Sequence, residues 1–372
     1  MKFYLQAISC LLLIELKGAD SVPRALELHV PFAPAVVRIA GQPTLYYELL
    51  LTNPTADTLN VQKLRVVSEA HAAVAVLEGA ALAARFGRTG QPSTSVLPGA
   101  AQVLYLEVEL PAEASVKQLG HHLTYTYRQG VQKRVVHSRD AWLPLKQHRA
   151  PVLGPPLRGG PWAAVYEPSW ERGHRRVRYT IDGQTRIPGR YAIDFIRLDR
   201  QGRYARADEN VVGNWYGYGA DVLAVRDGVV VATQNDFSES PTLAAHPAYS
   251  AAQATGNYIA LDLGRQQTAF YEHLRPGSLR VRPGQHVKQG QVLAQVGFTG
   301  QTTGPHLHFH LADAPSALGA EGAAYSFARF THLGTYLDFN QFGKRPWTAG
   351  GGSQPVLFVE ERPAANSVIQ FE

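Results

Sequence analysis

Residues 305–311 read PHLHFHL, with histidine at every second position: His306, His308 and His310. Such alternation is typical of a β-strand, in which successive side chains point to opposite faces of the sheet. We therefore expect the three imidazoles to share one face, while the leucines and the phenylalanine between and after them face an apolar core. The pattern predicts a strand of an all-β fold with a polar site on one side.

The spacing of this strand limits how the histidines can act together. A strand advances about 3.3 Å per residue, so His306 and His310 lie about 13 Å apart at the backbone. A zinc ion holds nitrogens at about 2.0 to 2.1 Å, which excludes one ion shared by all three. Neighbouring histidines, about 6.6 Å apart, can reach a common centre. A metal site here therefore needs at least one ligand from elsewhere in the chain.

Similar strand patterns extend from about residue 163 to 340, with turn signals such as Asp227-Gly228 and Pro283-Gly284 between them. The main segments are RYAIDFIRL (190–198), VLAVRDGVVVAT (222–233), GNYIALDLG (256–264), TAFYEHL (268–274) and QVLAQVGF (291–298). Segments rich in β-branched and aromatic residues and bounded by turn residues predict antiparallel strands.

The first part of the chain, residues 24–146, contains six or seven short alternating segments bounded by Gly, Pro, Asn or Asp. This spacing predicts a β-sandwich of immunoglobulin-like type. The helical exception is LEGAALAARFG, 77–87, which we expect to be a short connector. Residues 147–162 hold four prolines and three glycines. Because this composition disfavours a helix or a central strand, we expect a linker there.

The two ends of the chain have their own patterns. Residues 1–23 carry Lys2 before an apolar stretch from Phe3 to Ile14, which fits a secretory signal segment; a first buried strand or helix is the alternative. The signal reading implies a secreted or periplasmic protein of the cell envelope. No later stretch approaches the about 18 apolar residues of a membrane span. Residues 341–372 are glycine-rich at first and are expected to be a hinge and a loose tail.

The composition narrows the possible partners and metal ligands. Hydrophobic residues make up 45% and charged residues 18% of the 372-residue chain, as in soluble globular proteins. The net charge of +6 suits an anionic partner, but the basic residues are spread along the chain, so we expect no dedicated nucleic-acid surface. The single cysteine, Cys10, excludes an intramolecular disulfide and a multi-cysteine zinc site. Any metal must therefore be held by His, Asp or Glu.

Three residues outside the histidine strand are candidates for a site. Asp194 stands in an apolar strand segment, where an unpaired charge would be costly. Either metal ligation or an ion pair with Arg190 or Arg197 would satisfy it. His273, in FYEHL, lies on an alternating strand, where a lone histidine is more often a satisfied core residue. His174, in ERGHRRVRY, is placed in a polar loop.

Taken together, five segments resemble the lysostaphin-type zinc metallopeptidases, which are peptidoglycan-cleaving endopeptidases with a small antiparallel β fold. The segments are GPHLHFH, YGYGADVLAVRDGVVV, GNYIALDL, YEHLRPGSLRVRPGQHVKQGQVLAQVG and AIDF. The resemblance covers about residues 165 to 335. It implies a peptidase domain at 163–340 behind the sandwich, one zinc ion per chain and peptidoglycan stems or cross-links as substrate.

The resemblance also implies roles for individual residues. The family takes both members of a His-x-x-x-Asp pair and the second histidine of His-x-His as ligands, which makes Asp194 and His308 ligands here. Four residues before Asp194 stands Arg190, which is always protonated and cannot bind zinc. The long form of the family has GHRR about twenty residues before the aspartate, so the resemblance implies His174 as the third ligand. His306 and His273 match the active-site histidines that do not hold the metal.

The remaining roles follow from this assignment. We expect His306 to activate the attacking water, because an imidazole titrates near neutral pH. His273 would assist it or stabilise the oxyanion. His310 is expected to be structural or to hydrogen-bond a neighbour of a ligand. The aromatic residues of NWYGYG either line a substrate groove or pack the turn.

Two other functions are compatible with the sequence. A domain that binds no metal at all would be a cell-wall-binding protein or an activator of other wall hydrolases. An adhesin built from two β modules explains the strands but leaves the histidine pattern unexplained.

Overall fold

The computed structural model describes residues 26–87, 93–111, 116–129, 132–138, 141–145, 150–349 and 355–372. The signal segment expected at residues 1–23 and the first residues of the expected linker lie outside these ranges. Within them, no helix is both long enough and apolar enough to pass through a membrane.

The N-terminal domain consists of two antiparallel sheets that enclose one apolar core. Its first sheet is formed by β1 (Glu27–His29), β2 (Val37–Ile39), β3 (Gln42–Thr52) and β7 (Ala101–Glu109). The second is formed by β4 (Leu59–Ser68), β5 (Ala73–Glu78), β6 (Ser95–Val96), β8 (Gln118–Gln129), β9 (Gln132–Ser138) and β10 (Trp142–Pro144). The short helix α1 (Gly79–Ala83) lies within the expected helical connector.

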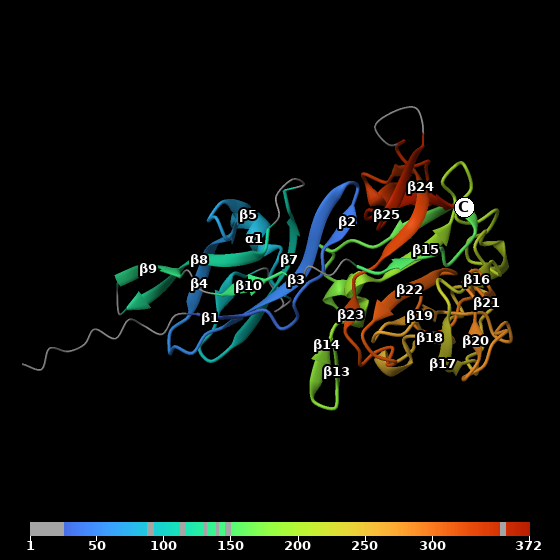
Figure 1. Cartoon of the computed structure of the whole chain (residues 1–372), viewed down its shortest axis with the longest axis horizontal. Helices are drawn as coiled ribbons and strands as arrows, with labels where there is room; N and C mark the ends of the chain where they lie inside the picture. The colour runs from blue at the N-terminus through green and yellow to red at the C-terminus, as the bar shows by residue number, and fades with distance from the viewer. Residues whose placement is uncertain are drawn as a thin grey trace, which may run out of the picture.

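The C-terminal domain is built on one twelve-stranded sheet, whose main path runs β11-β24-β26-β12-β15-β22-β19-β18-β17-β20. In chain order its strands are β11 (Val152–Leu153), β12 (Gly159–Val165), β15 (Ile193–Arg197), β17 (Gly228–Gln234), β18 (Tyr258–Asp262), β19 (Thr268–Glu272), β20 (His286–Val287), β22 (Leu307–Ala312), β23 (Gly322–Ala323), β24 (Ser326–Thr335), β25 (Val356–Glu361) and β26 (Ser367–Phe371). The all-β class predicted from the sequence is confirmed. Figure 1 shows the two domains side by side, with β2 and β3 of the first nearest to the second.

Smaller elements complete this domain. Two strand pairs lie outside the main sheet: β13 (Tyr179–Ile181) with β14 (Gln184–Arg186), and β16 (Asp221–Leu223) with β21 (Val292–Gln295). The 3₁₀ turns are η1 (His174–Arg176), η2 (Pro188–Tyr191), η3 (Val212–Asn214), η4 (Ala251–Gln253) and η5 (Phe339–Gln341).

The histidine strand β22 lies inside the main sheet between β15 and β19. Leu307, Phe309 and Leu311 are fully buried in the main apolar core, as the alternation predicts. The histidine face is also covered, since His306 and His308 are only 6% and 8% exposed. The strand is therefore buried on both faces, and its polar face lies in a pocket instead of on open surface.

The residues expected to form a loose tail instead complete the main sheet. Strand β25 pairs with β24, and β26 lies between β24 and β12. Phe371 is 1% exposed and packs against Phe195 and Phe327 at ring distances of 5.6 and 5.2 Å. The expectation was wrong because the apolar residues of SVIQF outweigh the effect of the glycines before them.

The expected linker is also partly a strand. Its last residues begin β12, which lies near the centre of the sheet between β26 and β15. Pro161 has no backbone N–H to donate, but the register of β12 against β26 shifts between Gly159 and Trp162. This bulge accommodates the proline in an otherwise paired strand.

Candidate metal centre

Two acidic side chains flank His308 in the sheet. The antiparallel register places Asp194 of β15 opposite His308 on one side and Glu272 of β19 opposite it on the other. Directly opposed residues in an antiparallel pair project from the same face. The sheet therefore brings two carboxyl groups to the polar face of β22.

His174 joins this face from η1, which precedes β15 in the chain. Its Nε2 atom lies 3.2 Å from Oδ2 of Asp194, and its ring centroid is 4.7 Å from that of His308. Nδ1 of His308 lies 2.8 Å from Oδ1 of Asp194. Ligand atoms of all three residues lie within 4.8 Å of one another. The structure thus brings together the three residues that the resemblance implied as ligands.

The chemistry of these three residues suits a zinc site. His174 and His308 contact different oxygens of Asp194, at 3.2 and 2.8 Å, and one ligand atom from each residue lies within 4.8 Å of the other two. The set of two imidazole nitrogens and one carboxylate is one that zinc accepts.

Among the residues that the structure describes, Asp194 forms its ion pairs with histidines and not with arginines. Besides His174 and His308, Nε2 of His306 lies 3.2 Å from its Oδ1 atom. Burial alone would raise the pKa of Asp194, but the charges and hydrogen bonds of His174 and His306 hold it well below the usual value. Arg190 instead reaches Glu48 at 2.5 Å, and the guanidinium of Arg197 stacks over the Trp162 ring.

His306 is held with its Nε2 atom toward the centre. Its Nδ1 atom is 2.8 Å from the carbonyl oxygen of Gly304, which can only accept, so Nδ1 carries the proton. Burial lowers the pKa of His306, but the charge of Asp194 and its hydrogen bond raise it above the usual value. A proton taken up at Nε2 of His306 is therefore stabilised by the carboxylate of Asp194, 3.2 Å away.

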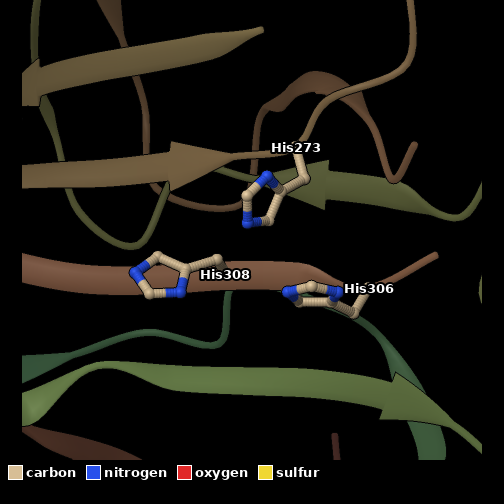
Figure 2. A group of neighbouring side chains, drawn as sticks. All are labelled: His273, His306 and His308. Atoms are coloured by element: carbon tan, nitrogen blue, oxygen red, sulfur yellow. The ribbon is translucent and has the colours of Figure 1, made fainter. Parts of the chain in front are cut away.

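His273 faces the same centre from the end of β19. Figure 2 shows its ring pointing toward the segment that carries His306 and His308, and its ring centroid lies 4.8 Å from that of His306 and 5.7 Å from that of His308. Its Nδ1 atom donates to the carbonyl of Thr299 at 2.8 Å. Burial, with the two neighbouring histidines, lowers its pKa well below the usual value. His273 is thus a neutral imidazole with Nε2 as an acceptor.

The backbone at His273 differs from the sequence expectation. Strand β19 ends at Glu272, and His273 follows it with a φ of 61°. A histidine in the left-handed region is uncommon, and such strain is concentrated at functional sites. This turn directs the imidazole toward the pocket instead of along the strand.

Of the two roles considered for His310, structural or hydrogen-bonding, its contacts favour the structural one. It is 2% exposed, and among the described residues neither ring nitrogen has a hydrogen-bond partner. Its Nδ1 atom is 3.6 Å from Oε1 of Glu272, which is too far for a hydrogen bond. The ring instead stacks on Phe270 at 4.8 Å with an interplanar angle of 14°.

Glu272 is the pocket residue that sequence reasoning missed. Burial and the negative charge of Asp194 raise its pKa to about 8, so in the absence of a cation this carboxyl is neutral at pH 7. In the sequence, the feature that could have indicated Glu272 is its place immediately before His273. In the structure, it lies in register with His308.

Two other groups of three also place ligand atoms within 4.8 Å: His273 with His306 and His308, and Glu272 with His308 and His310. The first contains no anionic ligand. Burial and the charge of Asp194 raise the pKa of the carboxyl in the second, whereas the pKa of Asp194 is held well below its usual value. The group of His174, Asp194 and His308 has an ionised carboxylate and is the best suited to a cation.

All of these side chains line one pocket of about 420 Å³, together with Arg172, Tyr179 and Thr302. Neither Trp215 nor Tyr218 lines it. Trp215 stacks on Tyr204 at 4.4 Å, and the hydroxyl of Tyr218 donates to Glu239. Packing of the turn is therefore the better interpretation of the aromatic residues in NWYGYG.

Comparison with known proteins identifies a family match in the C-terminal domain. Residues 215–318 match the sequence model of Peptidase family M23. This range includes His273, His306 and His308, whereas His174 and Asp194 precede it. Over this part of the chain, the resemblance to lysostaphin-type peptidases is confirmed.

Two relatives come from Vibrio cholerae. The chain is 33% identical over 134 residues to the peptidoglycan DD-endopeptidase ShyA. The aligned residues cover 36% of this chain and 26% of ShyA. It is 34% identical over 93 residues to the peptidoglycan DD-endopeptidase ShyB. These residues cover 25% of this chain and 18% of ShyB. The matches thus span about a quarter or less of these relatives.

Solved structures with similar parts include two peptidases. The catalytic domain of lysostaphin from Staphylococcus simulans is 21% identical, with 45% of this chain and 88% of that chain covered and a TM-score of 0.23. A zinc containing peptidase from Vibrio cholerae is 16% identical, with coverages of 81% and 87% and a TM-score of 0.27.

Proposed function

We propose that the protein is a zinc-dependent endopeptidase that hydrolyses peptide cross-links of peptidoglycan in the periplasm or outside the cell. The observation that carries this proposal is the meeting of His174, Asp194 and His308 within 4.8 Å, although Arg190 stands where the family usually has a ligand. The match to Peptidase family M23 and the relatives named as peptidoglycan DD-endopeptidases support the reaction and the substrate class.

Under this proposal, His174, Asp194 and His308 hold the metal. Three protein ligands leave a further position open, as in catalytic zinc sites. A bound zinc ion supplies Lewis acidity there and lowers the pKa of a coordinated water to about 7. The low pKa of Asp194 keeps its carboxylate ionised and ready for a cation.

We assign proton transfer to His306. Because its Nδ1 proton is held by the carbonyl of Gly304, its Nε2 atom accepts the proton of the attacking water and then returns it to the leaving amine. His273 has the same arrangement, with Nδ1 bonded to Thr299. A neutral His273 with an acceptor at Nε2 assists proton removal, whereas stabilising an oxyanion would need a proton that its low pKa opposes.

The test is digestion of purified peptidoglycan by the whole chain. The products are separated by liquid chromatography and identified by mass spectrometry, before and after zinc is removed with a chelator and restored. We expect cross-linked muropeptides to be converted to products with new amino termini, with activity lost on chelation and recovered with zinc. A protein that binds peptidoglycan, holds no zinc and cleaves nothing would be a wall-binding protein or an activator, and the proposal would be wrong.

A further inference from the structure

Two arginines next to the candidate metal centre reach into the N-terminal domain. Arg175 follows His174 directly in η1, and Arg190 lies in η2, immediately before the segment that carries Asp194. Neither arginine lines the pocket. Arg175 Nε lies 3.4 Å from Oε1 of Glu48, and Arg190 approaches Oε2 of the same carboxylate with Nε at 2.9 Å and Nη2 at 2.5 Å. One carboxylate of β3 therefore binds both turns.

This contact belongs to a row of six basic and acidic side chains across the domain boundary, four of which are buried. In spatial order its members are Arg85, Glu107, Arg175, Glu48, Arg190 and Glu321. The first, second and fourth come from the N-terminal domain. Glu48 is 3% exposed. Burial would raise its pKa, but Arg190 and Arg175 outweigh burial and lower it, so the carboxylate is charged. Separating a buried charge from its partner strongly destabilises the fold. The positions of Arg175 and Arg190 relative to Glu48 are therefore tightly defined.

Arg175 has further bonds that anchor η1 to the first domain. Its guanidinium donates to the carbonyl oxygens of Tyr47 at 2.9 Å and Leu106 at 2.7 Å, and to Glu107 at 2.6 Å. The Tyr46 ring lies 5.0 Å from its guanidinium carbon. The residue that follows the candidate ligand is thus held almost entirely by the other domain.

The two turns also contact each other at the ligand itself. A Cβ atom on Gly189 of η2 would lie 2.8 Å from Cβ of His174 and 3.0 Å from its carbonyl oxygen. Gly189 precedes Arg190, just as His174 precedes Arg175. His174 therefore packs against Gly189, and the residues that follow them, Arg175 and Arg190, are joined through Glu48.

We propose that Glu48 of the N-terminal domain is a positioning residue for the metal centre, which holds His174 at metal-binding distance from Asp194 and His308 by joining Arg175 to Arg190. This inference rests on the proposed function. It explains why an arginine can occupy position 190. Arg190 cannot bind the metal, but through Glu48 it fixes η1, the turn that supplies His174 as the ligand instead. The N-terminal domain is then part of the metal centre's support.

The first test is the zinc affinity of the metal-stripped whole chain, measured by competition with a chromophoric chelator. Glu48→Gln keeps the size of the side chain and removes its charge, and we expect about tenfold weaker zinc binding. The matched control is Arg38→Gln, which removes the ion pair between β2 and Glu361 of β25, at 3.7 Å, that also joins the two domains. We expect it to leave the zinc affinity unchanged.

The second test needs no metal. Hydrogen exchange is measured for the η1 amides of Arg176 and Val177, which donate to Gly173 at 2.8 Å and to His174 at 3.2 Å. In the metal-free chain, exchange should be faster in Glu48→Gln and unchanged in Arg38→Gln. A wild-type chain that binds no zinc would refute the proposed function, while this exchange result would still decide whether Glu48 anchors η1.

The inference is overturned if Glu48→Gln matches wild type in both zinc affinity and exchange, or if Arg38→Gln weakens zinc binding equally. Should Glu48→Gln not fold, Glu48→Asp replaces it, because it keeps the charge but shortens the side chain that reaches both Arg175 and Arg190. This variant should change both quantities in the same direction by a smaller factor, and unchanged values would overturn the inference.

Discussion

Replacing Gly189 with alanine measures how strictly the metal centre depends on the position of His174. The new Cβ would lie 2.8 Å from Cβ of His174. Carbon atoms in contact are about 3.5 to 4.0 Å apart, so η1 must move by about 0.7 Å or more. Metal-ligand distances tolerate about 0.2 Å. We therefore expect zinc binding to weaken about 10- to 100-fold, or about 1.4 to 2.8 kcal/mol.

Gly213→Ala is the matched control for this substitution. Gly213 also lies in a 3₁₀ turn, η3, and neither glycine has a positive φ, but a Cβ there would meet nothing within 4 Å. Zinc affinity is measured by chelator competition, and thermal unfolding of the metal-free chains checks that both variants are folded. Wild-type affinity in Gly189→Ala, or an equal loss in Gly213→Ala, would refute the reasoning.

Three further predictions concern neighbouring side chains. His306→Gln should retain zinc and lower muropeptide cleavage by about 10²- to 10⁴-fold, measured by metal content and product release. Glu272 has a pKa of about 8 against an ordinary 4.5, so it is neutral in the folded state while the unfolded state ionises. The metal-free wild type should therefore lose stability relative to Glu272→Gln as the pH rises from about 4.5 to about 8, as thermal unfolding would show. His310→Leu should retain zinc and stabilise the chain by about 1 kcal/mol. It removes two buried nitrogens that have no hydrogen-bond partner within the described ranges, and this gain outweighs the loss of ring stacking on Phe270.

Each of these has a contrary result. Loss of zinc in His306→Gln would make this histidine a ligand and not the proton acceptor. A stability difference between wild type and Glu272→Gln that does not vary with pH would mean that the carboxyl is ionised in the fold. A less stable His310→Leu chain would show that the imidazole has a hydrogen-bonding role.

Strand alternation predicted those parts of the site that lie on strands. The period of two in PHLHFHL places His306 and His308 on one face, and an acidic residue in an apolar segment marked Asp194. These inferences hold because a strand fixes the direction of each side chain locally. The covering of this face could not be predicted, since it depends on loops that close the pocket over β22.

The position of His174 depends on contacts between distant segments. Its motif suggested a role, but its distance from Asp194 depends on the packing of η1 on Gly189 and on Glu48, which lies 127 residues before Arg175 in the chain. No local pattern encodes such a contact. The strands at the C-terminal end were missed for a related reason, because Phe371 becomes buried only when the whole sheet is assembled.

The central claim, that His174 replaces the ligand missing at Arg190, is tested most directly by the zinc content of the purified whole chain. Zinc per chain is measured in wild type and in His174→Ala after equal exposure to zinc and removal of the excess. The account predicts about one zinc per chain in wild type and almost none in the variant. Equal zinc in the two proteins, or no zinc in either, would contradict it.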